Sequence, residues 1–174
     1  RHTPAVTLDG ESVSLEANIE LPRDAQAATE AGAVGVGLFR TEFLFMNRNG
    51  RLPSEDEQFE AYREAVLNMS GMPVTIRTVD VGADKPLDRM TVQELRHEHV
   101  LNPALGLRAI RWSLSEPDMF LIQLRAILRA SAFGKVRVLV PMVAHLSEVR
   151  QTFQQIALAK QQLSQAGIPY TDVQ

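Results

Sequence analysis

Three arginines close apolar or turn-forming segments of this sequence, and arginine is costly to bury unless its guanidinium is paired. They are Arg40 after residues 34–39, Arg77 after residues 74–76, and Arg108 after residues 102–107. The planar guanidinium fork matches a carboxylate or a phosphate group. Strands that end on such forks therefore predict a pocket for a small phosphorylated anion.

The same arginines also have a purely structural interpretation. Arg40 and Arg77 lie close in sequence to Glu42 and Asp80, with which they could form ion pairs. Two core-facing cations on adjacent strands repel each other unless they share an anion, which favours the functional interpretation for this pair. Arg108 has weaker support, because it sits in a helix-like stretch that holds a second arginine, and one of the two could face solvent.

Lys85 is a further basic candidate, directly after the turn-like residues 82–84. A lysine in such a turn is more often solvated, but it could equally close over a phosphate. Gly35 and Gly37 lie inside a predicted strand and lack the third glycine of a phosphate loop, so we expect them to permit close packing.

No cluster of side chains predicts a metal site. His97 and His99 lie in a polar stretch, and the acidic residues 55–57 are typical of a favourable helix start. The sequence has no cysteine, which excludes disulfides, thiolate metal ligands and a cysteine nucleophile within these residues.

The composition is that of a globular protein. The 174 residues are 45% hydrophobic and 22% charged, with a net charge of −3, which allows one domain with a sizeable core. No basic tract is present, so nucleic acid is not an expected partner. No apolar run reaches the ~20 residues of a membrane helix, and no signal core opens the chain, so we expect no membrane insertion and a cytoplasmic location.

Strand-like and helix-like segments alternate four times along the chain. We expect strands at about residues 16–20, 34–39, 74–79 and 136–140, with helices at about 23–31, 54–70, 115–133 and 147–166. Ser54 and Glu57 predict a capping box, and Phe153 is expected to face the core from the last helix.

This alternation predicts an α/β fold with a parallel sheet of about four βα units. The sheet is either a small open doubly wound one or about half of a (β/α)8 barrel, which typically takes ~250 residues. In both folds ligands bind beyond the carboxyl ends of the strands, where Arg40 and Arg77 are predicted to lie.

Four segments of the sequence resemble the enzyme I family of the bacterial phosphoenolpyruvate-dependent sugar phosphotransferase system. They are residues 35–46, 76–85, 102–111 and 124–134, and the likeness spans roughly residues 5 to 160 in the same order and spacing. Pyruvate phosphate dikinases and phosphoenolpyruvate synthases share the arginine pattern and are the alternative enzymes. A non-catalytic interaction module built on the same fold is the other alternative.

The resemblance implies a TIM barrel that binds phosphoenolpyruvate and Mg²⁺. It also implies transfer of the phosphoryl group to a histidine on another domain, then to a phosphocarrier protein, in an enzyme that is a homodimer. By motif position, it assigns Arg40, Arg77, Arg108 and Lys85 to the phosphoenolpyruvate site. The family's Mg²⁺ ligands, proton-donating Cys and phosphorylated His have no counterpart here. Residues 1–174 are therefore expected to be the N-terminal half of the barrel domain, with no catalytic residue and no transfer activity when isolated.

Overall fold

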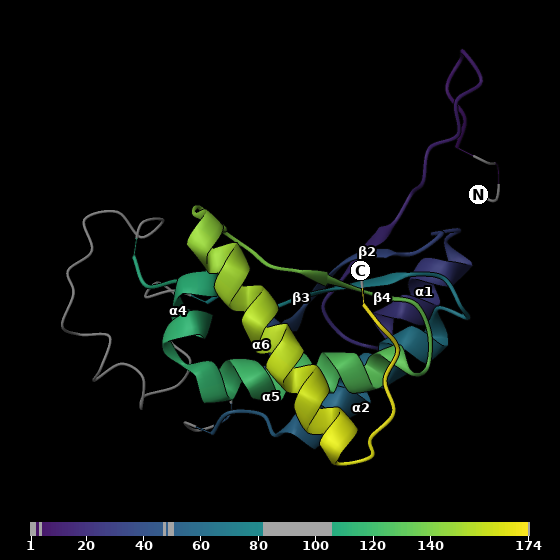
Figure 1. The fold of residues 1–174 in the computed structure, drawn as a ribbon. Coiled ribbons are helices and arrows are strands. Elements are labelled where there is room, and N and C mark those ends of the chain that lie inside the picture. The colour runs from purple at the N-terminus through teal and green to yellow at the C-terminus, as the bar shows by residue number, and fades with distance from the viewer. Residues whose placement is uncertain (1–2, 4, 47, 49–50, 82–105, 174) are drawn as a thin grey trace.

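The computed structural model describes residues 3, 5–46, 48, 51–81 and 106–173, which are built around a parallel sheet (Figure 1). The four strands are β1 (Ala17–Ile19), β2 (Val36–Arg40), β3 (Val74–Arg77) and β4 (Val136–Leu139). They lie in the order β1-β2-β3-β4, and each neighbouring pair is parallel. A sequential order is that of a barrel wall, whereas the order of a doubly wound sheet reverses at a switch point. The structure therefore favours the partial barrel.

The helices follow the predicted alternation. They are α1 (Asp24–Glu30), the 3₁₀ helix η1 (Thr41–Leu44), α2 (Glu55–Asn68), α4 (Ile110–Ser115), α5 (Pro117–Ser131) and α6 (Leu146–Gln165). The long helices α2, α5 and α6 lie together against the sheet (Figure 1). Of the helices that the described ranges contain, none combines the length and the apolar character that crossing a membrane requires.

Local signals in the sequence account for several helix ends. The Ser54 hydroxyl accepts a hydrogen bond from Glu57 N at 3.2 Å, and the Glu57 carboxylate accepts one from Ser54 N at 2.7 Å. This is the predicted capping box at the start of α2. Pro117 begins α5, where its missing N–H costs nothing. Gly167 follows α6 with a φ of +68°, which glycine adopts without strain.

The main core lies between the sheet and the helices. Phe39 of β2 and Ile76 of β3 are fully buried in it, and Phe39 packs edge-on against Tyr62 of α2, with ring centroids 5.9 Å apart. Side chains alternate along a strand, so the residues next to these core positions point to the opposite face of the sheet.

That opposite face carries charged side chains that bridge the two edges of the sheet. Glu16 precedes β1 and Arg137 lies in β4, yet Arg137 Nη1 is 3.1 Å from Glu16 Oε1. The backbones of the edge strands in a flat four-stranded sheet are about 14 Å apart, and here one arginine and one glutamate side chain close that gap. The Glu16 side chain passes over β2, where a Cβ added to Gly35 or Gly37 would lie 3.1 Å from Glu16 atoms. The two glycines thus permit close packing, as predicted, and the concave face is the one a barrel would enclose.

Candidate functional site

Arg40 and Arg77 lie at one edge and on one face of the sheet. Arg40 ends β2, Arg77 ends β3, and the two residues are register partners in the parallel ladder. Their preceding residues, Phe39 and Ile76, are also partners and are buried in the core. By alternation both arginines project on the concave side, at the carboxyl ends of the strands, where α/β barrels bind ligands.

Two carboxylates hold Arg77. Its Nη2 is 2.9 Å from Glu42 Oε1, and its Nη1 is 3.3 Å from Asp80 Oδ2. Glu42 Oε1 also accepts a hydrogen bond from Asp80 N at 2.8 Å. The Glu42 and Asp80 side chains are only 9% and 11% exposed, and burying a carboxylate is costly unless it is paired and hydrogen-bonded as these two are. The Arg77 guanidinium is therefore fixed in orientation by groups from two segments.

Arg108 joins this network through Asp80. Arg108 Nε is 3.0 Å from Asp80 Oδ1, while the other oxygen of the same carboxylate faces Arg77. The helix-like stretch that the sequence suggested around Arg108 begins only at Ile110, because Ala109 has a φ of 53°, outside the helical range. Arg108 thus precedes the helix, and Asp80 brings its guanidinium next to that of Arg77.

Arg40 has a partner that the sequence did not indicate. Its Nη1 is 3.0 Å from Glu20 Oε1, and the two side chains are 40% and 44% exposed. Glu20 follows Ile19, and Ile19 is the register partner of Phe39, so Glu20 reaches the same edge as Arg40. The pairing depends on the register between β1 and β2, whereas Glu42, the nearer acidic residue in sequence, binds Arg77 instead.

Arg77 carries a buried donor for which the described residues supply no acceptor. Arg77 Nε is buried and has no hydrogen-bond partner among the residues that the structure describes. Buried polar groups are nearly always satisfied, so this donor, in the arginine cluster of Arg40, Arg77 and Arg108, calls for an acceptor from beyond the described residues. Lys85, the fourth predicted contact, lies outside the described residues, as do His97 and His99.

Behind the arginines lies a buried polar cluster that sequence reasoning missed. It contains Thr41, Gln58, Tyr62 and Gln123, each no more than 1% exposed. Gln123 Nε2 is 3.2 Å from both Thr41 Oγ1 and Tyr62 Oη, and burial raises the pKa of Tyr62 above its ordinary value of 10.0. The available signal was a glutamine on the apolar side of the helix at 115–133, which is costly to bury without partners.

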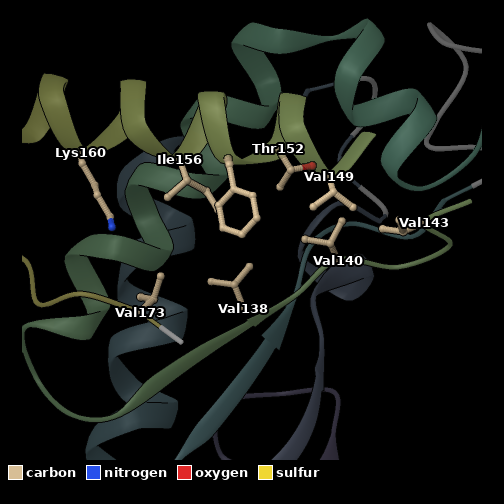
Figure 2. A pocket seen from close by; sticks show the side chains of 9 residues that line it. Val138, Val140, Val143, Val149, Thr152, Ile156, Lys160 and Val173 are labelled. Carbon is tan, nitrogen blue, oxygen red and sulfur yellow. The ribbon is translucent and has the colours of Figure 1, made fainter. Parts of the chain in front are cut away.

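A separate cavity of about 230 Å³ lies between β4 and α6 (Figure 2). It is lined by Val138, Val140, Val143, Val149, Thr152, Phe153, Ile156, Lys160 and Val173. Thr152 Oγ1 donates to Glu148 O at 2.8 Å, and Lys160 Nζ pairs with Asp172, so the polar atoms of the lining are already engaged. This apolar cavity does not suit a phosphorylated anion.

The prediction that Phe153 faces the core is wrong, because 67% of this residue is exposed. Helix α6 buries Ala159 and Leu163 against α4 and α5, whereas Phe153 lies at the cavity beside β4. A helical pattern identifies an apolar stripe, but it does not say which part of the stripe another element covers.

Comparison with known proteins identifies the family to which the chain is related. Residues 1–173 match the family described as "PEP-utilising enzyme, PEP-binding domain". The chain is 68% identical over 170 residues to a phosphoenolpyruvate-protein phosphotransferase of Cupriavidus necator, covering 98% of this chain and 28% of that protein. It is 45% identical over 171 residues to the protein of that name in Geobacillus stearothermophilus, and 44% identical over 172 residues to the one in Latilactobacillus sakei. These matches cover 98% and 99% of this chain, but only 28% and 29% of the relatives.

Proposed function

This chain belongs to the family of PEP-utilising enzymes, by its match to their PEP-binding domain, and we propose that it binds phosphoenolpyruvate as part of a phosphoenolpyruvate-protein phosphotransferase. The parent enzyme would move the phosphoryl group from phosphoenolpyruvate to one of its histidines and on to a phosphocarrier protein for sugar uptake. The observation that carries the proposal is the register pairing of Arg40 with Arg77 on the concave face. Arg108 belongs to the same proposed site through Asp80, and Lys85 by its place in the motif.

The chemistry of phosphoenolpyruvate suits these side chains. The molecule carries a phosphate and a carboxylate, and guanidinium forks bind both groups through paired hydrogen bonds. During phosphoryl transfer, charge spreads over the equatorial oxygens, and fixed cations stabilise it. Arg77, held by Glu42 and Asp80, supplies a preorganised guanidinium, and its Nε has no acceptor among the described residues.

Arg40 offers the more exchangeable position. Its ion pair with Glu20 is about 40% exposed on each side, and exposed pairs of this kind contribute only about 0–1 kcal/mol. An anionic ligand can therefore replace Glu20 at little cost. We infer that Arg40 turns from Glu20 to the ligand, whereas Arg77 stays in place.

We further propose that residues 1–174 are the N-terminal half of the barrel domain. The sequential parallel strands and the polar, curved face support this proposal. The parent is proposed to be a cytoplasmic homodimer. A dikinase-type enzyme or an interaction module is less well supported, because the relatives reported above all bear the phosphotransferase name.

The resemblance also implies Mg²⁺, but the described residues do not fit a magnesium site. In the part of the chain that the structure describes, no group of three or more His, Asp or Glu could hold a metal ion. Asp80 and Glu42 are already committed to arginines. We propose that other parts of the parent enzyme hold the ion, and no step here depends on it.

A matched pair of variants tests the proposal in the full-length parent enzyme. Arg40 and Arg137 have side chains 40% and 41% exposed, and each pairs with a glutamate flanking β1. Only Arg40 lies in the arginine cluster. We expect Arg40→Ala and Arg77→Ala to lower kcat/KM for phosphohistidine formation by about 10²–10³-fold, and Arg137→Ala to stay near wild type. Normal rates in both cluster variants would overturn the assignment.

A further inference from the structure

We propose that Gln123, buried in α5, is a positioning residue. It holds the carboxyl ends of β2 and β3 in register and so sets the spacing of Arg40 and Arg77. The inference rests on the proposed function, because it concerns how that same site is built. Gln123 is 0% exposed and lies in the helix-side core, so it can act on the ligand only through other residues.

The Gln123 amide directly joins the residues that follow β2 and β3. Its Nε2 donates to Thr41 Oγ1 at 3.2 Å, and Thr41 directly follows Arg40. Its Oε1 accepts from Val79 N at 3.0 Å, two residues after Arg77. One planar group from α5 thus fixes a point just beyond each arginine.

The direction of every hydrogen bond in this cluster follows from one backbone group. Val79 N can only donate, so it must face Oε1, and Nε2 must then donate to Thr41 Oγ1 and Tyr62 Oη. Because both hydroxyls accept a hydrogen bond from Gln123, each can donate its own hydrogen to another acceptor. Thr41 Oγ1 donates to Arg77 O at 2.8 Å, and Tyr62 Oη donates to Gln58 Oε1 at 3.1 Å.

The result is a network in which each group has its partner. It runs from Gln123 through Thr41 to the carbonyl of Arg77, and through Tyr62 to Gln58, whose Nε2 donates to Pro53 O at 3.1 Å. Fully satisfied buried networks are rigid and specify one arrangement. Thr41 directly follows β2 and Arg77 is the last residue of β3, so the hydrogen bond between them ties the ends of these two neighbouring strands together.

Residue 123 must both donate and accept for this arrangement to persist. Glutamate could accept from Val79 N, but it has no proton for Thr41 or Tyr62. Those hydroxyls would have to turn toward the carboxylate, and Arg77 O would lose its donor. Methionine is similar in length and removes all three bonds. Either change removes hydrogen bonds that join the carboxyl ends of β2 and β3, so the two arginines can shift. A misplacement of about 1 Å at a reacting group can cost about 10²-fold in rate.

A control on the same helix separates positioning from general stability. Ser131 is 3% exposed, its hydroxyl accepts from Thr171 N at 3.0 Å, and it is the last residue of α5, about two helical turns beyond Gln123. Ser131→Ala should therefore disturb a buried hydrogen bond of α5 without reaching the arginines.

The experiment uses the full-length parent enzyme and measures kcat, KM for phosphoenolpyruvate and Tm. We expect Gln123→Met and Ser131→Ala both to lower Tm, but only Gln123→Met to lower kcat/KM, by about 10–100-fold. Thr41→Val should reproduce this loss, Thr41→Ser should retain most of the activity, and the double variant Thr41→Val with Gln123→Met should lose little more than either single variant.

Wild-type kcat/KM in folded Gln123→Met, or an equal loss in Ser131→Ala, would overturn the positioning role. If Gln123→Met does not fold, the comparison of Thr41→Val with Thr41→Ser decides, since equal activity in these two variants would also overturn it. Failure of the proposed function gives a different result, because Arg40→Ala would then match the wild type.

Discussion

Arg77 and Glu42 form a largely buried ion pair in the candidate site, with Nη2 and Oε1 2.9 Å apart and side chains 20% and 9% exposed. Because Glu42 also accepts from Asp80 N, its removal leaves a donor unpaired and Arg77 with one carboxylate. We expect Glu42→Ala to lower the free energy of unfolding of the parent enzyme's domain by about 2–3 kcal/mol in urea denaturation. Glu42→Gln should cost less, since its amide oxygen can still accept from Asp80 N.

The comparison with Glu20 makes this prediction specific. Glu20 pairs with Arg40 in an exposed position, so Glu20→Ala should change the unfolding free energy by less than about 1 kcal/mol. Equal losses for Glu42→Ala and Glu20→Ala would show that burial does not distinguish the two ion pairs.

Arg77→Lys tests whether the site needs a fork or only a positive charge. Lysine keeps the charge that Glu42 and Asp80 require, but it is a point charge and cannot engage both carboxylates and a ligand through separate nitrogens. We expect the variant to fold and to lose about 10²-fold in kcat/KM for phosphoenolpyruvate. Arg137→Lys, on the same concave face, is the control and should remain near wild type. Full activity in Arg77→Lys would reduce the role of Arg77 to that of a general cation.

Gly35 and Gly37 should differ in their tolerance of alanine. A Cβ at Gly35 would lie 3.0 Å from Pro73 O, a backbone atom, whereas at Gly37 it would meet Glu16 Cβ at 3.1 Å and Glu16 Oε2 at 3.2 Å, with the nearest backbone atom, Ala17 O, at 3.9 Å. Gly35→Ala meets a backbone oxygen and the Pro73 ring together, whereas Gly37→Ala meets Glu16 alone at short range, so Gly35→Ala should lower Tm more than Gly37→Ala. The reverse order of the two Tm values would contradict the packing seen over β2.

The elements of this fold were predictable because their signals are local. The capping box at Ser54 and Glu57 depends on residues three apart, and the apolar runs before Arg40 and Arg77 mark strand ends directly. Parallel pairing then brings both arginines to one edge without further information. For this reason the placement of Arg40 beside Arg77 could be predicted from the sequence.

The partners of those residues were not predictable in the same way. The pairing of Arg40 with Glu20 depends on the register between β1 and β2, and that of Arg137 with Glu16 depends on the curvature of the whole sheet. The role of Gln123 depends on how α5 packs behind the strands. Each is a tertiary relationship between segments far apart in sequence, on which periodicity and spacing carry no information.

The capping box of α2 should make stability depend on pH in acid. The hydrogen bond from Ser54 N, with a further one from Arg48, lowers the pKa of Glu57 from 4.5 to about 2. Because the folded-state pKa lies below the ordinary one, the stabilisation is complete above pH 4.5 and is lost as the pH falls towards 2. Glu57→Gln, whose amide oxygen can still accept from Ser54 N, has no such titration. The difference in unfolding free energy between wild type and Glu57→Gln, measured by denaturant titration at several pH values, should therefore shrink steadily on acidification. A difference that stays constant across this range would contradict the proposed ionic contribution of the cap.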